Sequence, residues 1–253
     1  MPAGFIQICG RQLLISEFFL LQMMLGGILF FFFFLFNQSE SYTLQTDQGF
    51  GNLHILSAVK DTFVERAGKN WDKASFGHLI VGHLIHYPVK RTLIQFEDLP
   101  SSCPVDKIVW ARFFMHFVYA HRASFRSVRS QPWIDYTIHV HRIKRGWYEH
   151  STTPENRCNT CENRSWYKLR LELGRDAVPE PECIKTVIRS GQPGGRIGFD
   201  ITGAMKEWAS GQKNNGVLVK VDREDLSGRG LRFYDRHHKD VNMRPYAQVL
   251  CRY

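Results

Sequence analysis

The stretch FDITGAMKEWASGQKNNGVLV, residues 199–219, decides the fold. After a short extended run, Thr202 offers a hydroxyl that we expect to cap a helix. Ala204 and Trp208 lie four residues apart, so they share one face of that helix. Ser210 and the glycine after it end the helix, and an Asn-Asn-Gly turn leads into an apolar strand. The predicted unit is strand, short helix from Thr202 to Ser210, turn and strand, which is typical of a β-rich binding or structural domain.

The chain around this unit predicts many short strands separated by turns. In residues 134–144 apolar and polar side chains alternate, as in a half-buried strand. Residues 107–122 fit a helical stripe and an alternating pattern equally well, but their aromatic and β-branched content favours a strand. Residues 42–60 are polar and are predicted to be a loose arm. The other predicted strands are 61–65, 78–86, 91–96, 166–171, 184–188, 231–234 and 247–252.

The first 41 residues differ in kind from the rest of the chain. Residues 18–36 are almost all apolar, and at about 1.5 Å per residue they nearly span the apolar core of a bilayer. Small residues at 39 and 41 fit signal cleavage before Tyr42. The segment therefore predicts a cleaved signal peptide or a retained signal-anchor helix. We expect a secreted, extracellular protein or, as the alternative, a type II membrane protein held by residues 18–36.

The remaining chain is basic. Without residues 1–41 it has 32 Lys and Arg against 22 Asp and Glu, a formal charge of +10. Outside the cell this charge suggests acidic polysaccharide or matrix as a partner, although it also keeps a domain soluble. No nucleic-acid-binding motif is present in the sequence. Two basic clusters, one with an aromatic residue, are candidates for ligand binding and equally fit ordinary solvated loops: Arg142, Lys144, Arg145, Tyr234, Arg236 and Lys239.

Cysteine usage fits export. Five cysteines follow the apolar segment, so one of them is unpaired or joins another chain. The C-x-x-C pair lies in a polar loop without a helical pattern or a second ligand pair, which favours a disulfide over a redox or zinc site. In the same loop, Asn163 begins an Asn-Arg-Ser sequon and is predicted to be glycosylated. The disulfide candidates, with their pairing open, are Cys103, Cys158, Cys161, Cys183 and Cys251.

The order of several motifs resembles that of a known family. In chain order these motifs are RTLIQFEDLP, IVWARFFMHF, IHVHRIKRGWYEHSTT, the stretch quoted first, and LRFYDRHH. The series is similar to the DNRLRE domain, also called carbohydrate-binding module family 96, and covers about residues 61–253. The resemblance implies a jelly-roll β-sandwich and a binding role, which in some bacterial members is directed at acidic polysaccharide such as alginate. It also places cysteines near the second and last strands, here Cys103 and Cys251.

Two histidines raise the alternative of a metal site. His139 and His141 lie on one face of a predicted strand, a spacing that metal sites on sheets use. A cupin-type enzyme would need a third ligand close by, whereas Glu149 comes eight residues after His141. We interpret the two histidines as outward-facing polar residues. The sequence predicts no catalytic residue, metal or cofactor.

These observations together predict an all-β protein with a leader (1–41), an arm (42–60) and a jelly-roll β-sandwich (61–253). We expect Trp147 and Trp208 in its core or at the rim of that core. The expected function is a non-catalytic extracellular module that binds acidic polysaccharide or matrix. The alternatives are a structural or oligomer-forming extracellular domain, including a disulfide-linked oligomer, and the cupin-type metalloenzyme.

Overall fold

A computed structural model describes residues 41–46, 49–65, 77–83, 88–120, 136–149, 171–187, 195–225 and 229–253. The predicted leader, the sequon at Asn163, the cysteines Cys158 and Cys161 and most of the predicted strand 166–171 lie outside these residues. Within the described ranges, no helix is long and apolar enough to cross a membrane.

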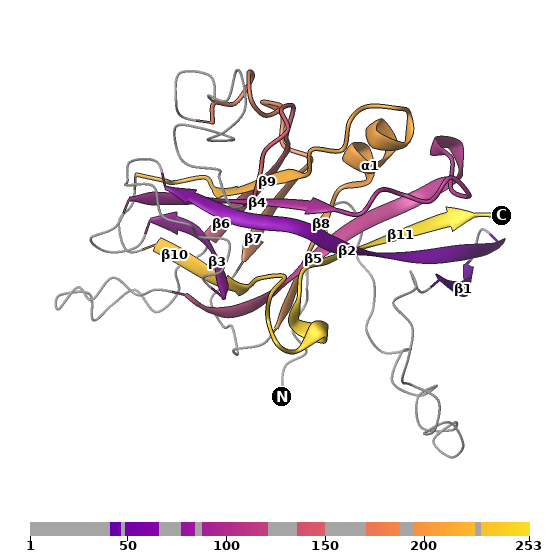
Figure 1. The fold of residues 1–253 in the computed structure, drawn as a ribbon, viewed down its shortest axis with the longest axis horizontal. Helices are drawn as coiled ribbons and strands as arrows, with labels where there is room; N and C mark the ends of the chain where they lie inside the picture. Colours follow the sequence, from indigo (N-terminus) through magenta and orange to yellow (C-terminus); the bar gives the residue numbers. More distant parts are fainter. Residues whose placement is uncertain are drawn as a thin grey trace, which may run out of the picture.

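The described chain consists mainly of β-strands, which confirms the predicted all-β class (Figure 1). A short helix, α1 (Thr202–Ala209), lies at the predicted place, and 3-10 turns form at η2 (Val105–Lys107) and η4 (Val241–Met243). The strands are β1 (Ser41–Thr46), β2 (Gly49–Glu65), β3 (His78–His83), β4 (Val89–Phe96), β5 (Ile108–Ala120), β6 (Tyr136–Arg142), β7 (Cys183–Val187), β8 (Arg196–Asp200), β9 (Val217–Val221), β10 (Arg229–Tyr234) and β11 (Tyr246–Arg252).

Six of these strands close into a ring. The pairing runs from β2 to β11, β5, β10, β3 and β4, and β4 returns to β2. The ring closes because β2 is long enough to pair with β11 through residues 51–57 and with β4 through residues 58–65. β1 adds to β2, β8 adds to β5, and β9, β6 and β7 extend the sheet from β4. The architecture is a six-strand barrel with attached strands. The jelly-roll sandwich stays a prediction.

The predicted loose arm over residues 42–60 is wrong. This segment forms most of β1 and much of β2. Its polar composition hides the strand, because β2 is held by backbone pairing to β1 on one edge and to β11 on the other. Leu53 and Leu56 are buried, and even the polar His54 is covered. A strand inside a sheet therefore forms here with little of the alternation that marks a strand in the sequence.

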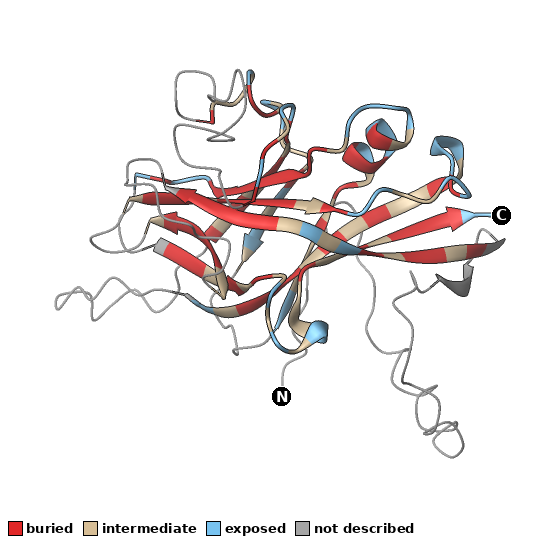
Figure 2. Ribbon diagram, in the orientation of Figure 1, coloured by how far each residue is buried: buried red, intermediate tan, exposed pale blue. Residues whose placement is uncertain are grey.

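The other predicted strands are confirmed where the structure describes them, except 166–171, whose one described residue, Leu171, is not in a strand. The ambiguous segment 107–122 forms the strand β5. The inward side chains of β5 belong to the main apolar cluster of the core. Figure 2 shows buried residues along the strands of the ring and exposed residues on the outer side of α1 and in the turns. Phe113 and Phe199 stack at the centre of this core, with their ring centroids 4.8 Å apart. Trp147 is buried in a second cluster and donates from its indole N–H to the carbonyl of Asn215 at 2.9 Å.

The helix α1 packs on β5. Ala204, Met205 and Trp208 are buried, as the spacing of Ala204 and Trp208 predicts. The predicted capping role of Thr202 is wrong, because its hydroxyl instead accepts the N–H of Ala111 at 2.9 Å. The side chain of Asp200 accepts the N–H of Thr202 at 2.9 Å in its place. Thr202 thus fastens the start of the helix to β5.

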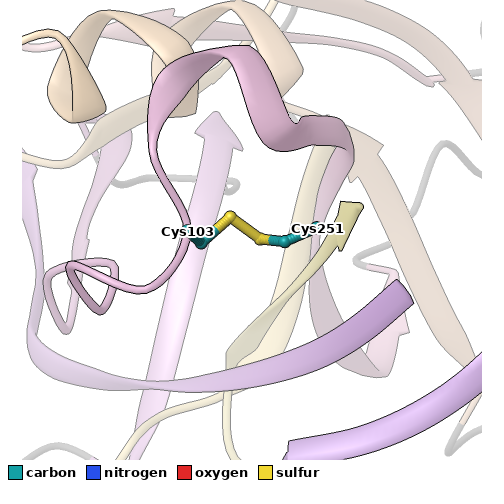
Figure 3. Close-up of a disulfide and its surroundings, with 2 residues drawn as sticks. All are labelled: Cys103 and Cys251. Atoms are coloured by element: carbon teal, nitrogen blue, oxygen red, sulfur yellow. A yellow bond between two sulfur atoms is a disulfide. The ribbon is translucent and has the colours of Figure 1, made fainter. Parts of the chain in front are cut away.

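A disulfide joins Cys103, in the loop before η2, to Cys251 on β11 (Figure 3). Both cysteines were candidates, and this pairing links the two that the family resemblance places near strands. Cys183, a third candidate, is buried at the start of β7.

Candidate functional site

The first predicted basic cluster lies at the end of β6 and is largely engaged within the protein. The guanidinium of Arg142 lies 3.1 Å from the carboxylate of Glu207 and 3.6 Å from that of Glu182. Arg145 lies 3.6 Å from the buried carboxylate of Asp176. The exposed Lys144 donates to the carbonyl of Gly174. A ligand carboxylate would have to compete for Arg142, so Lys144 is the cation of this cluster best placed for a ligand.

The second predicted cluster follows β10, and its Arg236 is also paired. Two guanidinium nitrogens of Arg236 each donate to one carboxylate oxygen of Glu149 at 2.6 Å. The backbone N–H of Arg236 donates to Asp61 at 2.6 Å. Lys239, in contrast, is exposed. The contacts of the two predicted clusters are separate, because the first cluster contacts α1 and residues 174–182 and the second contacts β2 and Glu149.

Tyr234 belongs to a wider surface that the sequence did not reveal. Leu231 and Phe233 point into the core, so Arg232 and Tyr234 lie on the opposite face of β10. The ring centroid of Tyr234 is 4.1 Å from that of His238 and 6.0 Å from that of His78 on β3. The guanidinium carbon of Arg232 lies 5.0 Å from the ring centroid of Tyr119 on β5. We call this set of five residues the aromatic surface: His78, Tyr119, Arg232, Tyr234 and His238.

The turn after β10 fixes part of the aromatic surface. His238 has Nδ1 at 3.2 Å from the backbone of Asp240, and its carbonyl accepts the side chain of Arg244 at 2.8 Å. Asp240 in turn caps η4 through the N–H of Asn242. These bonds hold His238 beside Tyr234.

The alternation on β10 places Arg232 and Tyr234 on one face, and this part of the surface is visible in the sequence. The contributions of His78 and Tyr119 depend on strand pairing across more than a hundred residues, Tyr234 with His78 and Arg232 with Tyr119. Such a pairing carries no local signal.

The interpretation of His139 and His141 as outward-facing residues is wrong for His141. Its side chain is buried, with Nδ1 at 3.0 Å from the carbonyl oxygen of Val178. Burial is the main reason that the pKa of His141 falls to about 4, so the imidazole is neutral at physiological pH. The ring centroids of His139 and His141 are 6.0 Å apart. Neither of the two clusters of three metal-ligating residues seen among the described residues includes them.

Of those two clusters, one is His54 with the disulfide-bonded Cys103 and Cys251. Disulfide sulfurs are not thiolates and do not act as the usual metal ligands. The other cluster joins Asp61 on β2, Glu149 after β6 and His237 after β10. Sequence reasoning missed it, because the three residues are far apart in the sequence and meet only in the fold.

The electrostatics of the second cluster are unusual. Burial is the main cause that raises the pKa of Asp61 to about 8. Burial also acts to raise the pKa of Glu149, but hydrogen bonds from Arg236 and from the N–H of Asp61 outweigh it, and the pKa is lowered. The two carboxyl groups therefore differ in protonation, one held neutral by its surroundings and the other held charged by an arginine.

The chain matches no known family when compared with models of protein families, and no curated protein when compared with curated sequences. The resemblance to the DNRLRE domain therefore stays a prediction. The chemistry of the site is inferred from its own residues.

Proposed function

We propose that this chain is an exported, non-catalytic module, with the jelly-roll organisation that its motif order suggests, and that it binds acidic polysaccharide. The observation that supports this proposal is the aromatic surface. Two tyrosines and two histidines lie there beside Arg232, and the exposed Lys239 follows in the same turn. Flat rings and cations in one place match the two chemical features of a uronic acid or sulfated sugar.

Each group has a distinct role in this proposal. The C–H groups of a sugar ring pack on the face of a tyrosine, which contributes apolar contact at little entropy cost because the side chain has few rotatable bonds. A carboxylate or sulfate on the sugar pairs with Lys239 or Arg232. The formal charge of +10 attracts an anionic chain from a distance and speeds its association.

The ion pairs within the protein change which predicted residues we expect to contact a ligand. Arg142 and Arg236 already bind carboxylates of the protein, so replacing them would disturb the fold as well as any ligand contact. Lys144 and Lys239 are exposed and can be replaced without breaking an ion pair seen in the described residues. The proposal therefore assigns the ligand contacts first to Tyr234, Arg232 and Lys239.

The test is chromatography of the secreted protein on heparin and alginate resins. The wild type should be retained at low salt and should elute as salt rises, because the Debye length contracts to about 8 Å at physiological ionic strength. Lys239→Gln should elute earlier, and Tyr234→Ala should weaken binding to alginate at constant salt. Lys206→Gln removes an exposed lysine of α1 and is the matched control, with elution like the wild type.

Absence of retention on both resins at low salt would reject the proposal. Equal elution of Lys239→Gln, Tyr234→Ala and Lys206→Gln would show that net charge alone drives retention and would remove the aromatic surface from the account.

A further inference from the structure

Three side chains that are distant in the sequence converge at one end of β2. Asp61 comes from β2, Glu149 from the segment after β6 and His237 from the turn after β10. One ligand atom from each lies within 4.8 Å of the other two. We propose that Asp61, Glu149 and His237 form a binding site for a divalent transition-metal ion of the zinc class.

The spacing of His237 and Glu149 fits two ligands of one ion better than it fits a hydrogen bond. Nε2 of His237 lies 3.6 Å from Oε1 of Glu149, beyond the usual hydrogen-bond range. Zinc binds nitrogen and oxygen at about 2.0–2.2 Å with tetrahedral geometry, which places two such ligands roughly 3.4 Å apart. The separation of these two atoms is therefore within a few tenths of an ångström of the separation that a zinc ion requires.

Asp61 supplies the independent observation. Its side chain is fully buried, and Oδ2 accepts the backbone N–H of Arg236. Among the described residues, the other oxygen, Oδ1, is buried without a hydrogen-bond partner. A buried carboxylate oxygen with no partner is costly and rare in native proteins. A metal ion bound by Oδ1 would supply the missing partner.

Arg236 is the cation that these acidic groups surround in the folded chain. Among the described residues, the buried carboxyl groups of Asp61, Glu149 and Asp235 lie around its guanidinium. Arg236 occupies the oxygens of Glu149 as a cation would. Its side chain is 27% exposed, so it can turn toward solvent and release Glu149 to an ion. Metal binding and the pairing of Arg236 with Glu149 are then alternatives.

The ligand set selects the class of metal. An imidazole nitrogen with carboxylate oxygens suits zinc and neighbouring transition metals, whereas calcium and magnesium prefer oxygen alone. The side chain of His237 is 40% exposed, which puts the site at the surface and leaves the fourth position of a tetrahedral ion to water.

The experiment uses the full chain after treatment with EDTA. Thermal unfolding and titration calorimetry are measured with zinc, calcium and magnesium chloride. Zinc should bind and raise Tm by a few degrees at saturation, an effect that EDTA reverses, and calcium and magnesium should not. Losing an outer-shell partner costs 10–100-fold in metal affinity, so losing a direct ligand in His237→Ala should weaken zinc binding about 100-fold or more.

A histidine outside both clusters is the control for binding by other imidazoles. His139→Ala removes a half-buried histidine of β6 and should bind zinc like the wild type. Asp61→Asn should also lose zinc binding. If that variant does not fold, the result for His237→Ala tests the proposal alone, because the side chain of His237 is partly exposed and its removal should leave the fold intact. Zinc affinity that is equal in the wild type, His237→Ala and His139→Ala would overturn the proposal.

Discussion

At the scale of single residues, His141 shows how burial changes chemistry. Its Nε2 is buried and has no hydrogen-bond partner in the described part of the chain, while Nδ1 faces the carbonyl of Val178. The folded-state pKa is about 4, against an ordinary value of 6.5, because burial disfavours the charged imidazole. Between these two values the unfolded chain binds a proton that the folded chain does not. Stability from this residue is therefore fully present above pH 6.5 and is lost as pH falls from about 6.5 to 4.

The prediction for His141 is a pH-dependent stability. A shift of this size corresponds to about 3 kcal/mol of unfolding free energy between pH 7 and pH 4. Burial raises the pKa of Asp61 to about 8, so this carboxyl group acts in the opposite direction over the same range. The contribution of His141 is therefore the difference between two proteins: between pH 7 and pH 4, the urea unfolding free energy of the wild type should fall relative to that of His141→Gln. The variant should keep a pH dependence of its own, because the pKa values of His54, His116 and His139 are lowered too. Parallel pH profiles for the two proteins would show that His141 is not the group that titrates.

At the scale of elements, the spacing of apolar residues was enough to predict α1. Trp208 lies four residues after Ala204, and both are buried in the core cluster. The turn after the helix was also predictable, from its Asn-Asn-Gly sequence. The structure explains the glycine: Gly216 has φ of +80°, and a Cβ there would collide with the carbonyl of Ile94. The bonds of Thr202 were not predictable, because its hydroxyl binds β5 and that contact depends on the fold.

The prediction for α1 is that Trp208→Ala destabilises the protein. The side chain is about 9% exposed, so its removal should lower the unfolding free energy by about 3–5 kcal/mol. Trp208→Phe should cost less, since it keeps most of the ring and removes an indole N–H that is unpaired within the residues the structure describes. Melting curves of the two variants and the wild type provide the measurement. An unchanged Tm for Trp208→Ala would mean that α1 is not anchored through this residue.

At the scale of the whole molecule, the sequence predicted the class and most strands but not the ring. Local patterns mark β4, β6 and β10, because these strands have clear apolar faces. They do not mark β2 as the strand that joins β11 to β4, because that role depends on a length of 17 residues and on polar residues held by backbone pairing. The cluster of Asp61, Glu149 and His237 has no local signal either, because its three segments meet only in the folded ring.

The prediction for the whole molecule concerns the Cys103–Cys251 disulfide. It closes a loop with a sequence separation of 148 residues. In the chain-entropy view, a crosslink of this length stabilises the folded state by about 5 kcal/mol, mainly by restricting the unfolded chain. The double variant Cys103→Ala, Cys251→Ala should therefore have a much lower urea midpoint. A midpoint equal to that of the oxidised wild type would show that the crosslink contributes nothing to stability.

The closed ring also sets the order of events during synthesis. β11 lies between β2 and β5 in the ring, and it is the last of the ring strands to be made. Until residues 246–252 have left the ribosome, β2 and β5 each lack a neighbour, and the disulfide lacks its second cysteine. The ring therefore closes only after β11 has been made. Until then the growing chain exposes open sheet edges, which can pair with strands of other chains.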